Sequence, residues 1–367
     1  MASMLFSPLT MRDLTLQNRI VVSPMGQYSA QNGSASDWHM MHLGSLAVSG
    51  VGLLIIEASA VDPAGRLSPN DLGIWSDENA AALEPAIAFC RKFGGARLGM
   101  QLWHAGRKGS VTVAWERQQR IAQEDGGWIP YGASDIPYPG RTTPIALDKA
   151  GIKHVIDCHV AAAQRADRLG LDLIEIHGAH GYLIHNFLSP LTNKREDEYG
   201  GDLKNRMRFG LELFGAVRAV WPERKPMGIR ISATDFAEGG WDIEDSIVFV
   251  QALQELGCDY VTASGGGAVP EQKLNVYPGY QVPYAERIKA ETGICTMAVG
   301  LITEPKQAEE ILTSGKADLV ALGRGMLYNP RWPWHAAVEL GEEFFYPKQY
   351  ERSHPSMRGG DFLKPAR

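Results

Sequence analysis

The chain has 367 residues, of which 44% are hydrophobic and 21% are charged, a composition typical of globular proteins that bury a large core. Its 36 basic and 42 acidic residues give a formal net charge of -6, and no long basic run would follow a phosphate backbone, so we expect no nucleic-acid partner. The four cysteines lie far apart without a Cys-x-x-Cys spacing, which argues against an iron–sulfur cluster or a zinc knuckle.

The first residues, Met1 to Phe6, lack the basic and apolar regions of a signal peptide, and no later stretch is long and apolar enough to cross a bilayer. We therefore expect a cytoplasmic protein with no membrane partner. Apolar and polar residues alternate from Leu5 to Gln17, which predicts that residues 1–17 hold a β-hairpin that plugs the bottom of a barrel.

Short apolar runs followed by segments of helical periodicity repeat along the chain, as in parallel sheets with crossover helices. The predicted strands are Arg19–Ser23, Gly52–Glu57, Leu98–Trp103, Leu173–His177, Met227–Ile231, Tyr260–Ala263, Thr296–Val299 and Leu319–Leu322. Predicted helices between them include Asp148–Leu169, Ile243–Leu256 and Glu304–Ser314, and a glycine follows each of these. Eight such units predict an α/β fold, a single (β/α)8 TIM barrel that forms one domain over residues 1–367, rather than a doubly wound sheet.

Two segments fall outside these strand–helix units. Residues 105–146 follow the third predicted strand and are too long for a routine connection, so we expect them to form a lid on the catalytic side. Residues 344–367 are rich in Pro, Gly and Arg and lack a helical period, so we expect an extended tail that either docks on a surface or stays free.

Two imidazoles and a phenol follow the fourth predicted strand, at the strand end where barrel enzymes carry their catalytic residues. His177 and His180 can both donate hydrogen bonds toward one oxygen, and Tyr182 carries a transferable proton, so the three could polarise a substrate and protonate it. The two histidines could instead bind a metal, but no nearby cysteine or pair of carboxylates completes a ligand set. Redox or acid–base chemistry is therefore the preferred interpretation, with metal-dependent hydrolysis second and no metal cofactor expected.

Glycine-containing turns follow the seventh and eighth predicted strands, where barrels commonly bind phosphate. Gly300 and Gly323 let the backbone approach an anion closely, and Arg324 can bind it through two hydrogen bonds. A phosphate at this edge, across the barrel mouth from His177 and Tyr182, fits a cofactor of the size of FMN. No Gly-x-Gly-x-x-Gly motif opens a helix, so a nicotinamide held in a Rossmann unit is not indicated.

Six segments carry motifs that occur together in one enzyme family. They are Asn18–Met25, Glu57–Val61, Gln101–Lys108, His177–Leu183, Tyr199–Gly201 and Ala298–Thr303. With these motifs in this order, the chain resembles the old yellow enzyme family of FMN-dependent ene-reductases, and within it the bacterial xenobiotic reductase-like subclass. The resemblance extends from about Leu5 to about Arg352.

The resemblance implies that the barrel mouth binds FMN non-covalently. The cofactor-binding residues that it implies are Ser23, Pro24, Met25, Ala60, Gln101, Arg230, Gly300, Gly323 and Arg324. Gln101 would bind the pyrimidine edge of the flavin and Arg230 the N1 and O2 edge, where a fixed cation stabilises the negative charge of the reduced ring. From its position alone, Arg230 could equally belong to an ion pair in the core.

The resemblance also implies a mechanism in which an activated alkene is reduced. His177 and His180 would bind its carbonyl or nitro oxygen, a hydride from flavin N5 would reach the β-carbon, and Tyr182 would protonate the α-carbon from the opposite face. NADPH, with NADH as the alternative, would first reduce the flavin in the same pocket, which gives a ping-pong cycle.

Further residues have implied roles at the edge of the pocket. Tyr28 would contact substrate, and Arg352 would enter the active site of a neighbouring subunit, which implies a homodimer or a tetramer of dimers. Arg107 and Lys108 either meet the extra phosphate of NADPH or form a solvated charged pair. Large aromatic core filler is the preferred interpretation of Trp103, ahead of a cofactor contact.

Gly26 departs from the subclass, whose members commonly have a cysteine at this position beside the flavin. We expect Gly26 to widen the pocket for bulky β-substituents and to make the flavin potential less dependent on bound substrate. Two other functions stay open from the sequence: a metal-dependent barrel hydrolase that uses His177 and His180, and a flavin-binding protein without catalysis.

Overall fold

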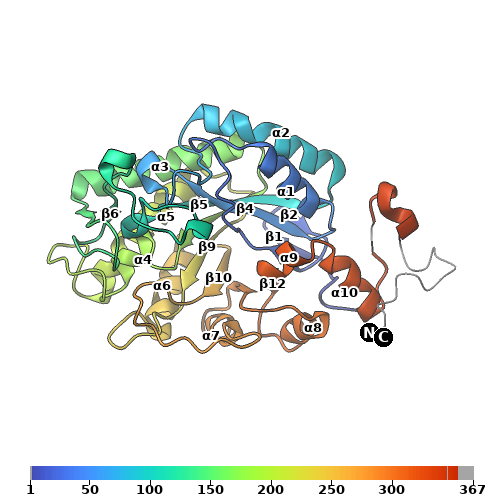
Figure 1. Ribbon diagram of the computed structural model, residues 1–367. Coiled ribbons are helices and arrows are strands. Elements are labelled where there is room, and N and C mark those ends of the chain that lie inside the picture. The colour runs from blue at the N-terminus through green and yellow to red at the C-terminus, as the bar shows by residue number, and fades with distance from the viewer. Residues whose placement is uncertain (1, 345, 354–367) are drawn as a thin grey trace.

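The computed structural model describes residues 2–344 and 346–353. Eight parallel strands form a closed barrel in which β3 pairs with both β4 and β12 (Figure 1). These strands are β3 (Ile20–Val22), β4 (Leu53–Ala60), β5 (Arg97–Trp103), β8 (Leu173–Gly178), β9 (Met227–Ser232), β10 (Tyr260–Ser264), β11 (Cys295–Ala298) and β12 (Leu319–Leu322). All eight predicted strands and the TIM-barrel fold are therefore confirmed.

Helices surround this barrel (Figure 1). They are α1 (Asp37–Ala47), α2 (Asp77–Phe93), α3 (Lys149–Arg168), α4 (Leu183–Leu188), α5 (Leu203–Val220), α6 (Ile243–Glu255), α7 (Val282–Thr292), α8 (Pro305–Thr313), α9 (Arg324–Tyr328) and α10 (Trp332–Leu340). The Asp148 side chain caps α3 by accepting a hydrogen bond from the Gly151 backbone N–H at 2.7 Å, which explains why this helix begins where predicted. In the part of the chain described, no helix combines the length and the apolar character that a bilayer crossing requires.

The N-terminal hairpin consists of β1 (Leu9–Met11) and β2 (Leu14–Leu16), paired in antiparallel register. Its side chains Met11, Leu14 and Leu16 are buried in one apolar cluster with inward-facing residues of the barrel. This cluster includes Leu53, Leu173, Tyr260 and Leu319, the first residues of β4, β8, β10 and β12. The hairpin therefore closes the N-terminal end of the barrel, as its alternating pattern predicts.

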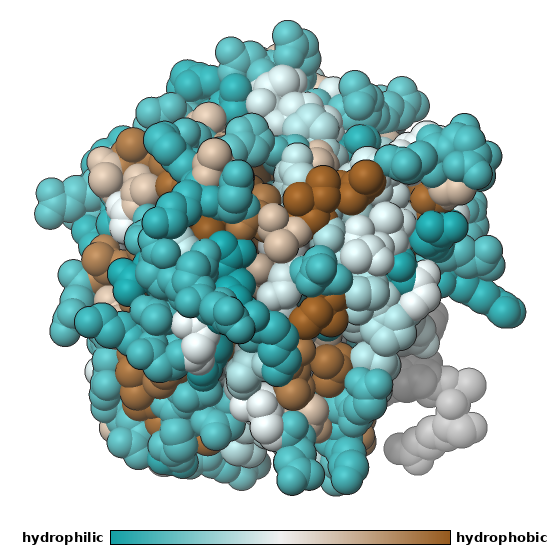
Figure 2. Space-filling view, turned by 90° about the vertical axis from the view of Figure 1, so that its left-hand side faces the viewer, coloured by the Kyte–Doolittle hydropathy of each residue, from teal (hydrophilic) through white to brown (hydrophobic). Residues whose placement is uncertain are grey.

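The long segment after β5 contains short elements rather than a structureless loop. They are η2 (Gly106–Lys108), η3 (Ala114–Glu116), η4 (Gln123–Asp125) and a parallel pair of β6 (Tyr131–Gly132) and β7 (Ile145–Ala146). The label β6 shows that this segment lies at the left-hand side of the molecule in Figure 1. Figure 2 shows that side face-on, with hydrophobic residues in separate groups among hydrophilic ones.

The C-terminal segment continues beyond α10 as a short 3-10 helix, η5 (Lys348–Ser353). The Tyr350 ring lies 5.8 Å from the Trp334 ring, and the Arg331 guanidinium lies 5.0 Å from the Tyr350 ring. The start of the predicted tail thus packs on α10, and Arg352 within it is exposed. The rest of the predicted tail, residues 354–367, lies outside the described residues.

Candidate active site

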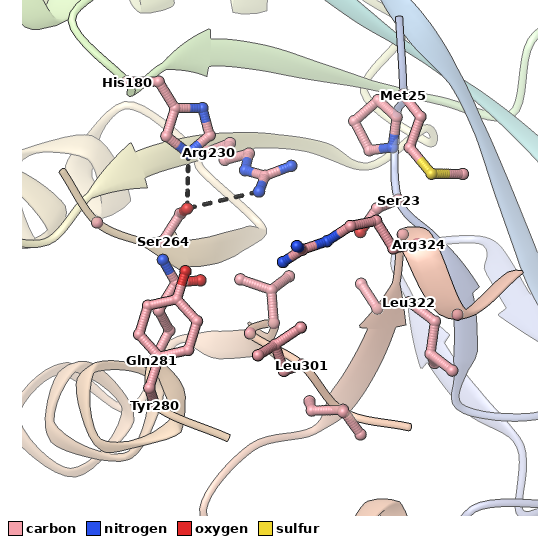
Figure 3. A pocket seen from close by; sticks show the side chains of 18 of the residues that line it. Ser23, Met25, His180, Arg230, Ser264, Tyr280, Gln281, Leu301, Leu322 and Arg324 are labelled. Carbon is pink, nitrogen blue, oxygen red and sulfur yellow. Dashed lines mark hydrogen bonds between the residues drawn. The ribbon is translucent and has the colours of Figure 1, made fainter. Parts of the chain in front are cut away.

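Two adjoining cavities lie at the C-terminal ends of the barrel strands, with volumes of about 460 Å³ and about 230 Å³. They share Pro24, His180 and Arg230 in their walls. The first, here called the cofactor cavity, is drawn in Figure 3, and the second is called the substrate cavity. Two connected compartments are what a resident cofactor with a substrate beside it requires.

Most of the predicted cofactor-binding residues line the cofactor cavity. They are Ser23, Pro24, Met25, Arg230, Gly300, Gly323 and Arg324. Gly300 has φ of +109°, and a Cβ atom there would lie 3.1 Å from the Gln281 backbone nitrogen, so only glycine fits without strain. The Arg324 side chain points into the cavity from the start of α9 (Figure 3). The backbone approach and the guanidinium that a phosphate needs are therefore both present.

The predicted catalytic and substrate-binding residues other than Arg352 line the substrate cavity together with Gln101. They are Gly26, Tyr28, His177, His180 and Tyr182. Trp103 also lines this cavity, with its ring centroid 4.9 Å from that of Tyr182. Trp103 is 4% exposed and belongs to a buried apolar cluster with Leu67, Ala105 and Val111. It therefore fills part of the core, as preferred, and is also part of the cavity wall.

The two histidines form a hydrogen-bonded chain of neutral imidazoles. The Ala179 backbone N–H donates to His177 Nδ1 at 3.2 Å, so the proton of a neutral His177 is on Nε2. This Nε2 lies 3.3 Å from His180 Nδ1, and His180 Nε2 lies 2.7 Å from Ser264 Oγ (Figure 3 shows the latter contact). Burial, followed by the charge of Arg230, lowers the pKa of both histidines well below the usual value. Both imidazoles are therefore neutral, and each carries one N–H group.

Tyr182 lies beside these histidines as the residue that precedes α4. Burial raises its pKa well above the ordinary value, so the phenol keeps its proton at physiological pH. The Lys108 ammonium donates a hydrogen bond to the His180 carbonyl at 2.7 Å and lies 5.4 Å from the Tyr182 ring centroid. Burial lowers the pKa of Lys108 to about 7.

The positions of Arg107 and Lys108 contradict the interpretation that they form a solvated charged pair. Arg107 is 3% exposed and donates hydrogen bonds to the carbonyls of Ile136, Pro137 and Ala268. Neither side chain is a solvated charge, because the Arg107 Nη1 and Nη2 groups donate to backbone carbonyls and the Lys108 ammonium donates to the His180 carbonyl. A sequence cannot reveal this, because the carbonyls belong to loops distant in the chain.

Glu175 is a buried carboxylate beside the site that the sequence analysis missed. Gln101 Nε2 donates to Glu175 Oε1 at 2.7 Å, and Thr262 Oγ1 donates to Oε2 at 2.5 Å. The residue is completely buried, and the positive charge of Arg230 opposes the rise in its pKa that burial causes. The sequence did contain a signal for it, a single carboxylate between Ile174 and Ile176 in an apolar strand. A charge buried in this way requires polar partners, so its position points to a polar site nearby.

The hydrogen bonds around Glu175 and Ser264 leave the Nε atom of Arg230 without a partner. Arg230 Nη2 donates a long hydrogen bond of 3.4 Å to Ser264 Oγ, and its buried Nε has no hydrogen-bond acceptor. An unsatisfied buried donor is costly unless a ligand supplies the acceptor. The donor set at the wall of the cofactor cavity therefore fits the electron-rich edge of a flavin.

Two predicted site residues do not line either cavity within the described part of the chain. Ala60 is fully buried at the end of β4, where its backbone N–H donates to the Leu72 carbonyl at 2.8 Å. Arg352 lies on η5, exposed and separate from both cavities. A single chain therefore does not supply the arginine that the resemblance places in the site.

Further lining residues also escaped the sequence analysis. Ser264 ends β10 and follows the same strand-end rule as His177, so it could have been found. Asp71 and Leu67 come from the loop between β4 and α2 and carried no signal. Burial raises the pKa of Asp71 to about 6, and its carboxylate accepts hydrogen bonds from the backbone N–H groups of Leu67 and Ser68.

The sequence model of the NADH:flavin oxidoreductase / NADH oxidase family matches residues 4–343. The chain belongs to this family. The NADPH dehydrogenase of Geobacillus sp. (strain WCH70) is 48% identical over 355 residues, which are 96% of this chain and 99% of that protein. The NADPH dehydrogenase of Bacillus licheniformis is 44% identical over 352 residues, 95% of this chain and 98% of the relative.

Solved structures agree with this membership. Morphinone reductase is 28% identical with a TM-score of 0.77, over 97% of this chain and 92% of that one. Its complex with tetrahydroNAD gives a TM-score of 0.75, over 96% of this chain and 93% of that one. The resemblance to the old yellow enzymes and the expected FMN cofactor are thereby confirmed, and a metal-dependent hydrolase is no longer a competitive interpretation.

The buried histidines predict a loss of stability in acid. Burial is the largest cause of a lowered pKa at His177 and His180, at His159 (to about 4) and at His104 (to about 3). Unfolded histidines titrate near 6.5, so the unfolded chain binds more protons below that pH. Stability is therefore full above about pH 6.5 and falls below it, by up to about 1.4 kcal/mol per pH unit for each such group.

Urea unfolding of the FMN-saturated protein at several pH values between about 5 and 8 tests this expectation. His159 is the best residue for an isolated test, because it lies on α3 and outside both cavities. His159→Gln should make the pH dependence shallower by about one proton. An unchanged slope in this variant would show that other groups cause the acid sensitivity.

Proposed function

We propose that the protein reduces the carbon–carbon double bond of α,β-unsaturated carbonyl or nitro compounds with NADPH as reductant. The observation that carries the proposal is the combination, in one cavity, of two neutral imidazole donors and a protonated phenol next to the cofactor cavity. The relatives are named NADPH dehydrogenases, which supports NADPH as the reductant. NADH, which lacks only one phosphate of NADPH, is the alternative reductant.

His177 and His180 would hold the carbonyl or nitro oxygen of the substrate and stabilise the negative charge that develops on it. Tyr182 would deliver its proton to the α-carbon. When bound, FMN supplies the hydride that it has received from the nicotinamide. Gln101 and Arg230 would hold the ring, and Gly300, Gly323 and Arg324 the phosphate. Because alkene and nicotinamide would use the same cavity in turn, we expect ping-pong kinetics.

Three further assignments belong to this proposal. Tyr28 would contact the substrate from the segment after β3. Residues 105–146 would act as a lid, and the hydrogen bond from Lys108 to the His180 carbonyl connects this lid to the site. Arg352 would complete the site of a neighbouring subunit in a homodimer or a tetramer of dimers.

A single spectroscopic experiment tests the function. The visible spectrum of the purified protein is recorded, NADPH is added without oxygen, and cyclohexenone follows. The proposal expects a flavin spectrum that NADPH bleaches and cyclohexenone restores. A colourless protein that does not take up FMN would contradict it, and a yellow protein that NADPH cannot bleach would indicate flavin binding without catalysis.

Gly26 gives a prediction about substrate size. A Cβ atom at Gly26 would lie 3.6 Å from Tyr28 Cζ, an ordinary van der Waals distance, and its backbone is not in the left-handed region. Gly26→Cys should therefore fold and bind FMN, but lower kcat/KM for β-substituted enones more than for cyclohexenone, by roughly tenfold, the usual effect of small changes in pocket volume.

Gly26→Ala is the matched control for this variant, because it adds volume without a thiol. If Gly26→Ala reproduces the change in substrate preference while only Gly26→Cys shifts the flavin midpoint potential, volume and thiol have separate effects. Identical rates for both classes of enone in all three proteins would contradict the expectation.

A further inference from the structure

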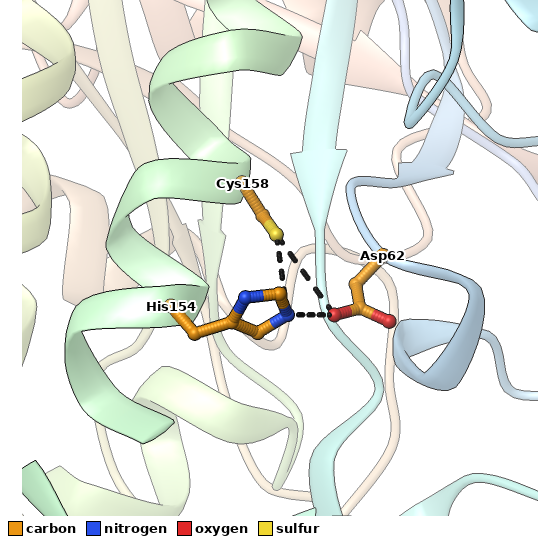
Figure 4. Close-up of side chains that lie close together, drawn as sticks. All are labelled: Asp62, His154 and Cys158. Carbon is orange, nitrogen blue, oxygen red and sulfur yellow. Dashed lines mark hydrogen bonds and ion pairs between the residues drawn. The ribbon is translucent and has the colours of Figure 1, made fainter. Parts of the chain in front are cut away.

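Asp62, His154 and Cys158 form a compact group of potential metal ligands outside both cavities (Figure 4). Asp62 follows β4 and precedes η1 (Pro63–Gly65), whereas His154 and Cys158 lie one turn apart on α3. His154 Nε2 is 2.7 Å from Asp62 Oδ2 and 3.6 Å from Cys158 Sγ, and Cys158 Sγ is 3.9 Å from the same oxygen. Three different donor atoms therefore face one another across a short space.

These separations approach those of three ligands on one zinc ion. Tetrahedral bonds of about 2.3 Å to sulfur and about 2.1 Å to nitrogen and oxygen place sulfur about 3.6 Å from the other two donors, and nitrogen about 3.4 Å from oxygen. The two observed sulfur distances, 3.6 and 3.9 Å, are within about 0.3 Å of this geometry. Only the imidazole–carboxylate distance must lengthen, as expected when bonds to a metal replace a hydrogen bond.

The chemistry and accessibility of the donors favour the same ion. A thiolate, an imidazole and a carboxylate suit zinc, whereas magnesium and calcium prefer oxygen ligands alone. Asp62 is buried and its Oδ1 accepts a hydrogen bond from the Ala64 backbone N–H at 2.6 Å, which orients Oδ2 toward His154. The His154 side chain is 58% exposed, so an ion can enter from solvent and a water molecule can occupy the fourth position.

We propose that Asp62, His154 and Cys158 bind one zinc ion, with water as the fourth ligand. Binding exchanges the Cys158 S–H bond for a Zn–S bond and releases that proton to solvent, with no change of oxidation state. Without metal, burial and the neighbouring carboxylates of Asp62 and Asp157 raise the pKa of the thiol to about 12, so the metal must displace the proton.

The proposed ion would connect the substrate cavity to the outer helices. Asp62 is the second residue of the segment between β4 and α2, and Leu67 and Asp71 of this segment line the substrate cavity. A bond from Asp62 through zinc to α3 would restrain this segment, whereas the hydrogen bond to His154 holds it less firmly. We therefore expect zinc to raise the thermal midpoint of the holoenzyme.

Zinc titration of the chelator-treated holoenzyme, in competition with a chromogenic chelator, tests the site. We expect one zinc ion per chain and an X-ray absorption spectrum with one sulfur at about 2.3 Å. Cys158→Ser and His154→Ala should each weaken binding at least about tenfold, and Cys158→Ser should remove the sulfur signal. Cys90→Ala, which changes a free thiol on α2 outside the group, should leave the affinity unchanged.

Thermal unfolding of each variant without zinc shows whether it folds, and only folded variants enter the comparison. His154→Cys offers a second test, because it replaces the imidazole by another thiolate. A folded His154→Cys variant should bind zinc more tightly than His154→Ala, with two sulfur ligands. Failure of the wild-type protein to bind stoichiometric zinc, or equal binding by Cys158→Ser, would overturn the proposal. Neither outcome bears on alkene reduction, since the two sites share no residue.

Discussion

Replacing Tyr182 by phenylalanine should leave flavin reduction by NADPH within about twofold of the wild-type rate while alkene reduction falls by about 10²- to 10³-fold. Only the second half-reaction needs a proton on carbon, and the buried Tyr182 phenol, whose pKa is raised by desolvation, keeps its proton in the substrate cavity beside His177 and His180. Stopped-flow measurements of the two half-reactions, each monitored by flavin absorbance, check the expectation.

Tyr131→Phe is the matched control, because it removes the same hydroxyl from a ring that stacks on His104 outside the substrate cavity. Both half-reactions should keep their rates in this variant. Equal losses in the two half-reactions of Tyr182→Phe would mean that Tyr182 supports the structure of the cavity rather than donating a proton.

The barrel could be predicted from the sequence because its signals are local. Each strand is a short apolar run, and residues such as Asp148 mark helix starts through a hydrogen bond within one turn. The candidate site followed from the same signals, since the C-terminal ends of all strands meet at one face and bring His177 together with Gly300 and Arg324.

The residues that could not be predicted are those whose roles depend on partners distant in the chain. Asp71 reaches the substrate cavity through the conformation of a loop, and Arg107 donates to the carbonyls of Ile136 and Ala268, which lie 29 and 161 residues away in the chain. Trp103 fills an apolar cluster as expected but also lines the substrate cavity, because a pattern of alternation identifies the inward face and not the depth at which a side chain lies. Residue type and spacing do not show which distant segments of the chain contact a side chain in the folded protein.

Arg230 and Glu175 should shift the flavin midpoint potential in opposite directions. The buried Arg230 cation at the cofactor cavity favours the negatively charged reduced ring, so Arg230→Met should lower the potential and weaken FMN binding. Glu175 partly offsets this cation, so Glu175→Gln should raise the potential. Potentiometric titration with redox dyes and measurement of FMN content check both expectations.

The stability of the two variants tests whether the residues act as a pair. Arg230→Met removes the positive charge that opposes the rise in the pKa of the buried Glu175, so this variant should be less stable than the wild type. The double variant Arg230→Met/Glu175→Gln should regain only part of this loss, because both Gln101 and Thr262 donate to Glu175 and an amide offers a single oxygen. Potentials that shift in the same direction in both single variants would indicate a distorted cavity rather than an electrostatic effect.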